Sequence, residues 1–147
     1  MSASTAERQI ISRGIQRFYP NMPLGAVKVY AGCALGISSS GYVGLLSDTT
    51  YTKAVGVAEK TVDNSAGSAG DKTVNVLRGE FFFDNDGTNA LTIAHVGPLL
   101  AGLVEWSDDH TAANASDTGS AVGGTLIEVV AADSEKNLDA GVWIEFP

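Results

Sequence analysis

From residue 26 onward, apolar side chains recur mostly at every second position or in short runs, and Gly, Ser, Asn and Asp interrupt them. A period of two places apolar side chains on one face of an extended strand, whereas a helix requires a period near 3.6. The pattern therefore predicts an all-β fold, a small β-sandwich or barrel of short antiparallel strands. We expect strands at residues 26–31, 33–37, 42–46, 54–59, 73–83, 98–104, 124–131 and 141–146.

The longest expected strand, at residues 73–83, cannot alternate regularly along its whole length. Val74 and Val76 share one parity, whereas Phe81 and Phe83 share the other. A bulge near Arg78 would reset the register. Three consecutive phenylalanines also place at least one ring on each face of the sheet, so we expect both faces to be covered.

The first 25 residues differ in kind from the rest of the chain. Ser4 and Glu7 have the spacing of a capping box, yet a glycine and two prolines follow closely. We expect residues 1–25 to form an extended N-terminal arm with at most one or two helical turns. Residues 26–147 are expected to form a single β domain.

Charge is distributed unevenly along the chain. Residues 1–30 hold four basic residues and one acidic residue, a net charge of +3, whereas the other 117 hold 5 basic and 16 acidic residues, a net charge of −11. Phosphate binding requires clustered Lys and Arg, which the acidic body lacks. The composition therefore argues against a nucleic-acid partner.

The chain shows no export or membrane signal in its sequence. Its start is interrupted by Glu7 and Arg8, and the longest apolar run, at residues 96–104, is too short to span a bilayer. The single cysteine, Cys33, excludes an internal disulfide and is interpreted as a small buried hydrophobe. We expect a soluble protein of a reducing compartment, without a membrane partner.

Residues 67–73, GSAGDKT, contain the glycines, lysine and threonine of a phosphate-binding loop. In such a loop the lysine opens a helix and no carboxylate faces the phosphates. Here Asp71 precedes Lys72 directly, and the residues that follow predict a strand. We therefore interpret the stretch as a loop between two strands.

The remaining polar residues do not form a recognisable catalytic or metal motif. Asp108, Asp109 and His110 could contact a metal, but no second cluster has matching spacing, so we expect three solvated loop residues. His95 and His110 have no nucleophile or carboxylate partner in a motif. The sequence predicts no enzyme activity, no metal and no cofactor.

Five segments of the chain follow one another in a recognisable order. They are YAGCALGI, GYVGLL, AVGVAEKTVDNSAGSAGDKTVNVLRGEFFF, HVGPLL and AGVWIEF. Together they resemble the capsid cement, or head-decoration, proteins of tailed bacteriophages. The resemblance covers roughly residues 24–146 and is most specific between Val62 and Phe83, whereas PLLAGLVEWSDDHTA, at 98–112, departs from the family pattern.

The resemblance implies a non-enzymatic homotrimer on the outer capsid surface of the virion, which clamps neighbouring major capsid proteins and is present in the host cytoplasm during assembly. We expect the arm to order on docking, with its apolar side chains buried and its arginines against acidic capsid surface, or to pair within its own trimer. The expected contact residues are Arg8, Ile10, Ile11, Arg13, Arg17 and Phe18.

Two other functions remain open from the residues. One is a β module of a phage tail or fibre, where glycine-rich hairpins are equally common. The other is a carbohydrate-binding or hydrolytic domain that uses Trp106 or Trp143 as a sugar platform.

Overall fold

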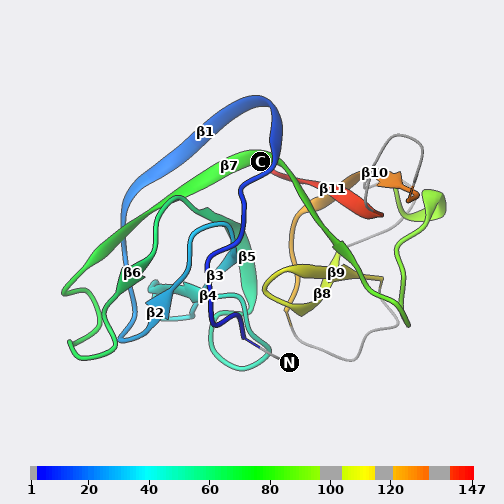
Figure 1. Ribbon diagram of the computed structural model, residues 1–147. Helices are drawn as coiled ribbons and strands as arrows, with labels where there is room; N and C mark the ends of the chain where they lie inside the picture. Colours follow the sequence, from blue (N-terminus) through cyan, green and yellow to red (C-terminus); the bar gives the residue numbers. More distant parts are fainter. Residues whose placement is uncertain (1–2, 97–103, 115–120, 133–139) are drawn as a thin grey trace.

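Strands account for nearly all of the regular structure in the computed structural model, which describes residues 3–96, 104–114, 121–132 and 140–147 (Figure 1). The all-β prediction is confirmed. The only helical element in the described part is the 3-10 turn η1, Ile93–His95. The strands are β1 Ser12–Pro23, β2 Lys28–Val29, β3 Ala34–Ile37, β4 Val43–Leu45, β5 Lys53–Ala58, β6 Val62–Asp63, β7 Thr73–Asn85, β8 Glu105–Asp108, β9 Thr111–Ala113, β10 Thr125–Val130 and β11 Gly141–Phe146.

Strand β7 is the centre of a mixed sheet that curls into a half-barrel. The sheet has the order β10-β11-β7-β5-β3-β4, and β1 and β9 pair with β7 outside this path. The pairing of β7 with β9 is parallel, and the other strand pairs are antiparallel. Strands β2 and β6 form a separate two-stranded sheet.

The even-numbered and odd-numbered apolar residues of β7 lie in two different hydrophobic cores. Val74 and Val76 are buried in a cluster with residues of β3 and β4, such as Leu35 and Val43. Phe81 and Phe83 are buried in the other cluster. The even-numbered valines and the odd-numbered phenylalanines of β7 therefore pack in different cores. This division was not predicted.

The larger core contains a group of aromatic rings around Trp106. Phe83 packs edge-on against Trp106 with centroids 4.8 Å apart, and Phe146 stacks on Trp106 with centroids 6.0 Å apart. The Trp106 Nε1 donates a hydrogen bond of 2.8 Å to the Gly123 carbonyl oxygen, which satisfies the indole inside the core.

The glycine-rich stretch around residues 67–73 is a loop that leads into strand β7, as predicted. Asn64, only 1% exposed, organises it. Its Nδ2 donates to the carbonyl oxygens of Leu24, Gly25 and Ser68 at 3.4, 3.0 and 2.9 Å. The Gly70 amide also donates to the Leu24 carbonyl at 2.8 Å. The loop therefore anchors the chain just after β1.

Residues 3–25 contain no helical turn, which is consistent with the prediction of an extended arm with at most one or two. Ser4 and Glu7 bond to distant partners instead of capping a helix: Ser4 to Asp109, and Glu7 Oε1 to the Thr61 hydroxyl at 2.6 Å. The extended conformation continues as β1, which pairs with β7 of the same chain.

The irregularity expected near Arg78 lies in the partner strand β1. Arg13 pairs with Glu80 and Arg17 pairs with Arg78, so three residues of β1 stand opposite Gly79 alone. Of the strand predicted at residues 98–104, residues 98–103 lie outside the described residues.

Candidate interaction surface on strand β1

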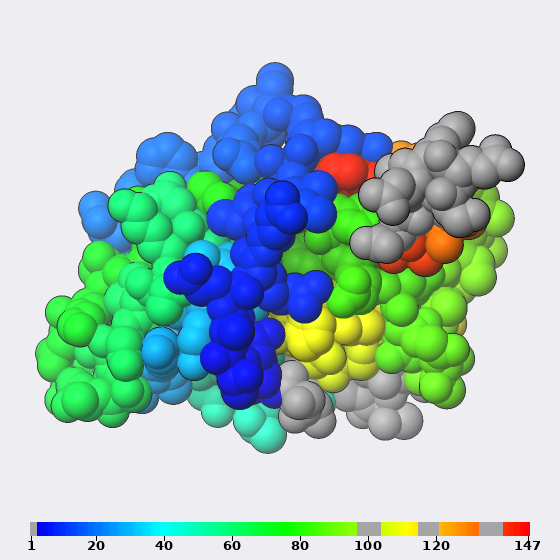
Figure 2. Space-filling view, in the orientation of Figure 1, coloured from blue at the N-terminus to red at the C-terminus, as the bar shows by residue number. Residues whose placement is uncertain are grey.

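Strand β1 carries most of the exposed apolar surface that the structure describes. Of the five large hydrophobic side chains that are exposed in the described ranges, four lie between residues 11 and 19. They are Ile11 at 43%, Ile15 at 80%, Phe18 at 55% and Tyr19 at 38% exposure, and the fifth is Ile93 at 77%. Figure 2 shows this N-terminal segment, in blue, lying along the outside of the molecule.

β1 is an edge strand. It pairs with β7, and in the described part of the chain no other strand pairs with it. Two prolines, Pro20 and Pro23, remove amide donors near its end, and the amide of Asn21, at a φ of +51°, donates to Asn75 Oδ1 at 2.9 Å. The free edge available to another chain therefore lies mainly before Pro20.

Two of the predicted contact arginines are already engaged within the chain. Arg8 Nη2 lies 3.1 Å from Asp84 Oδ2. Arg13 Nη1 lies 2.6 Å from Glu128 Oε2, and its guanidinium carbon is 4.2 Å from the centre of the Trp143 ring. In this structure these two cations hold the arm against its own body.

Of the other predicted contact residues, one is partly buried and three are exposed. Ile10 packs against the larger core and is only partly exposed. Ile11, Arg17 and Phe18 are exposed. The register places Arg17 opposite Arg78 and Phe18 opposite Leu77, so Arg17 and Phe18 face opposite sides of the sheet.

The predicted contact residues leave out Ile15 and Tyr19, which are both exposed. Ile15 lies in the irregular part of β1, and Tyr19 forms a cation–π contact with Arg78, whose guanidinium carbon is 4.3 Å from the ring centre. Reading residues 12–23 as a strand would have indicated both, because an edge strand exposes alternate side chains on its solvent face.

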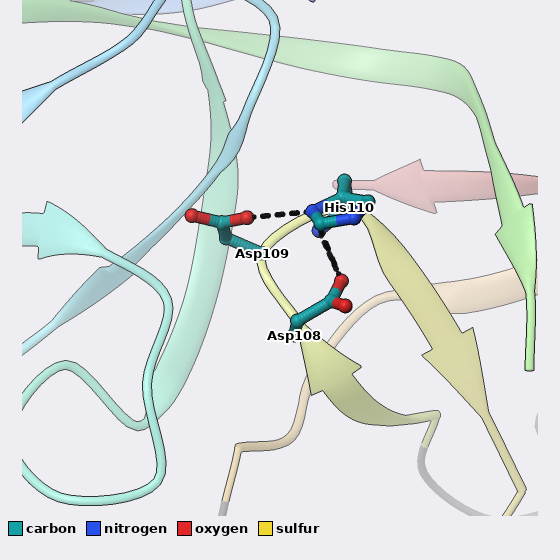
Figure 3. A group of neighbouring side chains, drawn as sticks. All are labelled: Asp108, Asp109 and His110. Carbon is teal, nitrogen blue, oxygen red and sulfur yellow. Dashed lines mark hydrogen bonds and ion pairs between the residues drawn. The ribbon is translucent and has the colours of Figure 1, made fainter. Parts of the chain in front are cut away.

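The Asp108, Asp109 and His110 cluster lies in the hairpin between β8 and β9 (Figure 3). Their potential ligand atoms lie within 4.8 Å of one another. Asp109 is fully buried, which corrects the expectation of a solvated residue. Its Oδ2 accepts the Ser4 amide at 3.0 Å and its Oδ1 accepts the Ser4 hydroxyl at 2.6 Å. The cluster therefore binds the N-terminal segment.

The arrangement of Ser4, Asp109 and His110 differs from that of a catalytic triad. A triad imidazole uses one nitrogen for the nucleophile and the other for the carboxylate. Here the same Nδ1 of His110 lies 3.2 Å from Ser4 Oγ, 2.9 Å from Asp109 Oδ1 and 3.1 Å from Asp108 Oδ1. The serine hydroxyl donates to the carboxylate, so these contacts fix an extended segment in place.

Cys33 is buried near the same segment, as predicted. Burial raises the pKa of the Cys33 thiol to about 11, although a hydrogen bond with Ser4 acts in the opposite direction. A neutral buried thiol is a poor nucleophile.

Trp106 is buried, and Trp143 is partly covered. Trp106 is fully buried, so it cannot serve as a sugar platform on the surface. The Trp143 ring lies beneath Arg13 and packs edge-on against Phe82 at 5.5 Å.

Comparison of the chain with protein-family models, with curated proteins and with solved structures finds no match. The described residues also include no helix of sufficient length and hydrophobicity to cross a membrane.

Proposed function

We propose that this protein is a capsid cement, or decoration, protein that binds the outer surface of a tailed-phage head and clamps neighbouring major capsid proteins. The observation that carries the proposal is the concentration of exposed apolar side chains on a free strand edge. The segmental resemblance to decoration proteins, and an all-β body with a net negative charge, support it.

The proposed contact uses the outer edge of β1 and the side that carries Phe18. A free edge offers unpaired amide and carbonyl groups, so an extended capsid segment can add to it as a further strand. Phe18, 55% exposed, would then be covered by that segment. Burial of apolar surface stabilises such a contact by about 25 cal/mol per Å² before the costs of association are subtracted.

Trimerisation would strengthen this clamp. In the proposal, three copies form one rigid body, so that after the first contact the others become intramolecular. The gain in avidity is then about 10² to 10⁴ when the geometry permits simultaneous engagement. Modest individual contacts are sufficient under these conditions.

Point substitutions in β1 provide the test. Removing the whole arm would also remove the bonds of Ser4 to Asp109 and the pairing of β1 with β7, so loss of binding would not separate contact from folding. The informative variant is Phe18→Ser, and the control is Ile93→Ser, which changes an exposed hydrophobic side chain outside β1.

The measurement is co-sedimentation with heads assembled from the major capsid protein of the same phage. We expect Phe18→Ser to lower retention at least tenfold and Ile93→Ser to leave it unchanged. Equal retention of both variants would refute β1 as the contact. Labelled protein found on tails instead of heads by electron microscopy would refute the decoration role itself.

A further inference from the structure

Arg17 and Arg78 are neighbouring cations without an ion pair in the described ranges. They are register partners on β1 and β7, so their side chains lie next to each other on one face of the sheet. Like charges directly opposite each other destabilise a sheet. The chain holds 17 acidic and 9 basic residues, yet none of the described carboxylates pairs with either arginine. An anion from another molecule can therefore bind here without displacing an internal ion pair.

The two arginines differ in how they are held. Arg78 Nε donates to the Pro147 carbonyl oxygen at 2.9 Å, and its guanidinium carbon is 4.3 Å from the centre of the Tyr19 ring. Arg17 is exposed, and its guanidinium has neither a hydrogen bond nor a ring contact in the described part of the chain. Arg78 is therefore a fixed charge, whereas Arg17 offers its N–H donors to a ligand.

A groove of about 490 Å³ opens beside this pair and is also lined by Glu80 and Glu145. Glu80 already has a cation nearby, since its Oε2 lies 3.6 Å from Arg13 Nε. Glu145 is the register partner of Glu80 on β11, and β1 and β11 pair with opposite edges of β7. Two strand spacings, about 10 Å, therefore separate the backbone at Glu145 from that at β1. A carboxylate that approaches from the outer edge of β1 meets Arg17 before it comes near either glutamate.

The edge of β1 at Arg17 limits the register in which a further strand can pair. Residues 17–19 pair regularly with β7, between an irregular stretch and Pro20, which has no amide to donate. Arg17 and Phe18 are consecutive and face opposite sides of the sheet. An added strand therefore places one residue beside Arg17 and the next residue of its own chain beside Phe18. In strand addition the main chain supplies affinity and the alternating side chains supply specificity.

We propose that β1 selects an extended segment of the major capsid protein in which an acidic residue directly adjoins an apolar one. The acidic side chain pairs with Arg17, and Arg78 adds its charge from the next strand, while the apolar side chain covers Phe18. The inference rests on the decoration function proposed above and adds the chemistry of the partner segment to it. Opposite charge on the partner favours this segment over others and like charge disfavours it.

Two synthetic octapeptides, one of alternating valine and glutamate and one of alternating valine and lysine, test this selection on the full-length chain. The measurement is the NMR chemical shift of the backbone amides of residues 16–19. The valine–glutamate peptide should shift these signals at a concentration about tenfold or more below that required of the valine–lysine peptide. Arg17→Glu should reverse the preference. The control Lys60→Glu makes the same change in charge at an exposed position outside the groove and should keep the preference.

Equal shifts with the two peptides, or no shift with either at millimolar concentration, would overturn the proposal. A preference that Arg17→Glu leaves unchanged would also overturn it. Inorganic phosphate that shifts the same signals as strongly as the valine–glutamate peptide would assign a general anion site instead of a segment site. Circular dichroism confirms that the variants are folded.

The peptide assay contains no heads, so its failure leaves the decoration role intact. Wild-type protein that prefers the valine–glutamate peptide but is not retained on heads would refute the decoration role, and with it only the source of the segment.

Discussion

The guanidinium of Arg13 lies over the ring of Trp143, with 4.2 Å between its central carbon and the ring centre. The same side chain forms a 2.6 Å ion pair with Glu128 and a longer one with Glu80. Arg13 belongs to β1, whereas its partners belong to β7, β10 and β11. One side chain therefore connects the N-terminal strand to three others.

Arg13→Ala should lower the free energy of unfolding by about 1 kcal/mol, because it removes a cation–π contact and two partly exposed ion pairs. Thermal unfolding should shift downward by roughly 2 to 4 °C for a chain of this size. The matched control is Arg17→Ala on the same strand, which removes no ion pair in the described structure. If the two variants unfold at the same temperature, the Arg13 contacts do not stabilise the fold.

Gly32→Ala should release the N-terminal segment. Gly32 has a φ of +84°, and an added Cβ would overlap the carbonyl oxygen of Arg8. Gly41→Ala is the control, since Gly41 has nearly the same φ, +85°, with open space around the added Cβ. Both variants incur about 1 to 2 kcal/mol of backbone strain. Only Gly32→Ala should also accelerate hydrogen exchange at the Arg8 amide, and equal exchange in the two variants would contradict the contact.

Asn64→Ala should destabilise the protein by about 1 to 2 kcal/mol, because it removes a buried side-chain donor from three carbonyl oxygens, each of which keeps one backbone donor. Asn64→Asp should be at least as severe, since a carboxylate would face the same carbonyl oxygens. Ser65→Ala, an exposed change in the same loop, should stay within about 0.5 kcal/mol of wild type. Urea unfolding measures all three. A neutral Asn64→Ala would show that the loop does not anchor the end of β1.

Asp109→Ala should loosen residues 3–6, since it removes the acceptor of both the amide and the hydroxyl of Ser4, whereas the contacts of Arg8 and Ile10 remain. Ser4→Ala removes only the hydroxyl bond and should cost about 1 kcal/mol. Limited proteolysis should cleave the N-terminal segment fastest in Asp109→Ala, more slowly in Ser4→Ala, and at the wild-type rate in the control Thr5→Ala. The same cleavage rate in all four proteins would mean that Asp109 does not hold this segment.

Stability should fall as the pH rises from about 9 to about 11. Burial raises the pKa of Cys33 from its ordinary value near 9 to about 11, so the folded protein retains a proton that the unfolded chain loses. The contribution is complete below pH 9 and decreases by up to about 1.4 kcal/mol per pH unit above it. Burial also raises the pKa of Tyr51, which acts in the same direction.

The variant Cys33→Ala distinguishes the contribution of the Cys33 thiol to this pH dependence from that of Tyr51. Its urea midpoint should fall less steeply than that of wild type between pH 9 and pH 10.5. Parallel slopes in the two proteins would rule out the thiol as the cause.

The body strands were predictable because their side chains alternate between core and solvent. The strand predicted at residues 141–146 coincides with β11, Gly141–Phe146. Strand β1 was predicted only as extended chain. Its glycine, its prolines and its exposed apolar side chains obscure the alternation of apolar and polar residues that indicates a strand. Strands β8 and β9 were not predicted, because the polar residues Asp108, Asp109 and His110 are typical of a loop. Asp109 is nevertheless buried.

The exposure of the N-terminal segment could be predicted in part. An apolar, basic N-terminal segment indicated a contact region, and Ile11, Arg17 and Phe18 are exposed there. The sequence could not show that Arg8 and Arg13 are bound to acidic residues far away in the chain, since such pairing depends on the tertiary fold.

The position of β7 in the middle of the chain has a consequence for biosynthesis. Its partners range from β1 to β11, so a nascent chain emerging from the ribosome carries β7 well before the last partner is translated. During that interval the phenylalanines of β7 lack their cover, and such intermediates are prone to aggregate. Substitutions that weaken β11 should therefore reduce the yield of recombinant expression more than they reduce the melting temperature of the purified product.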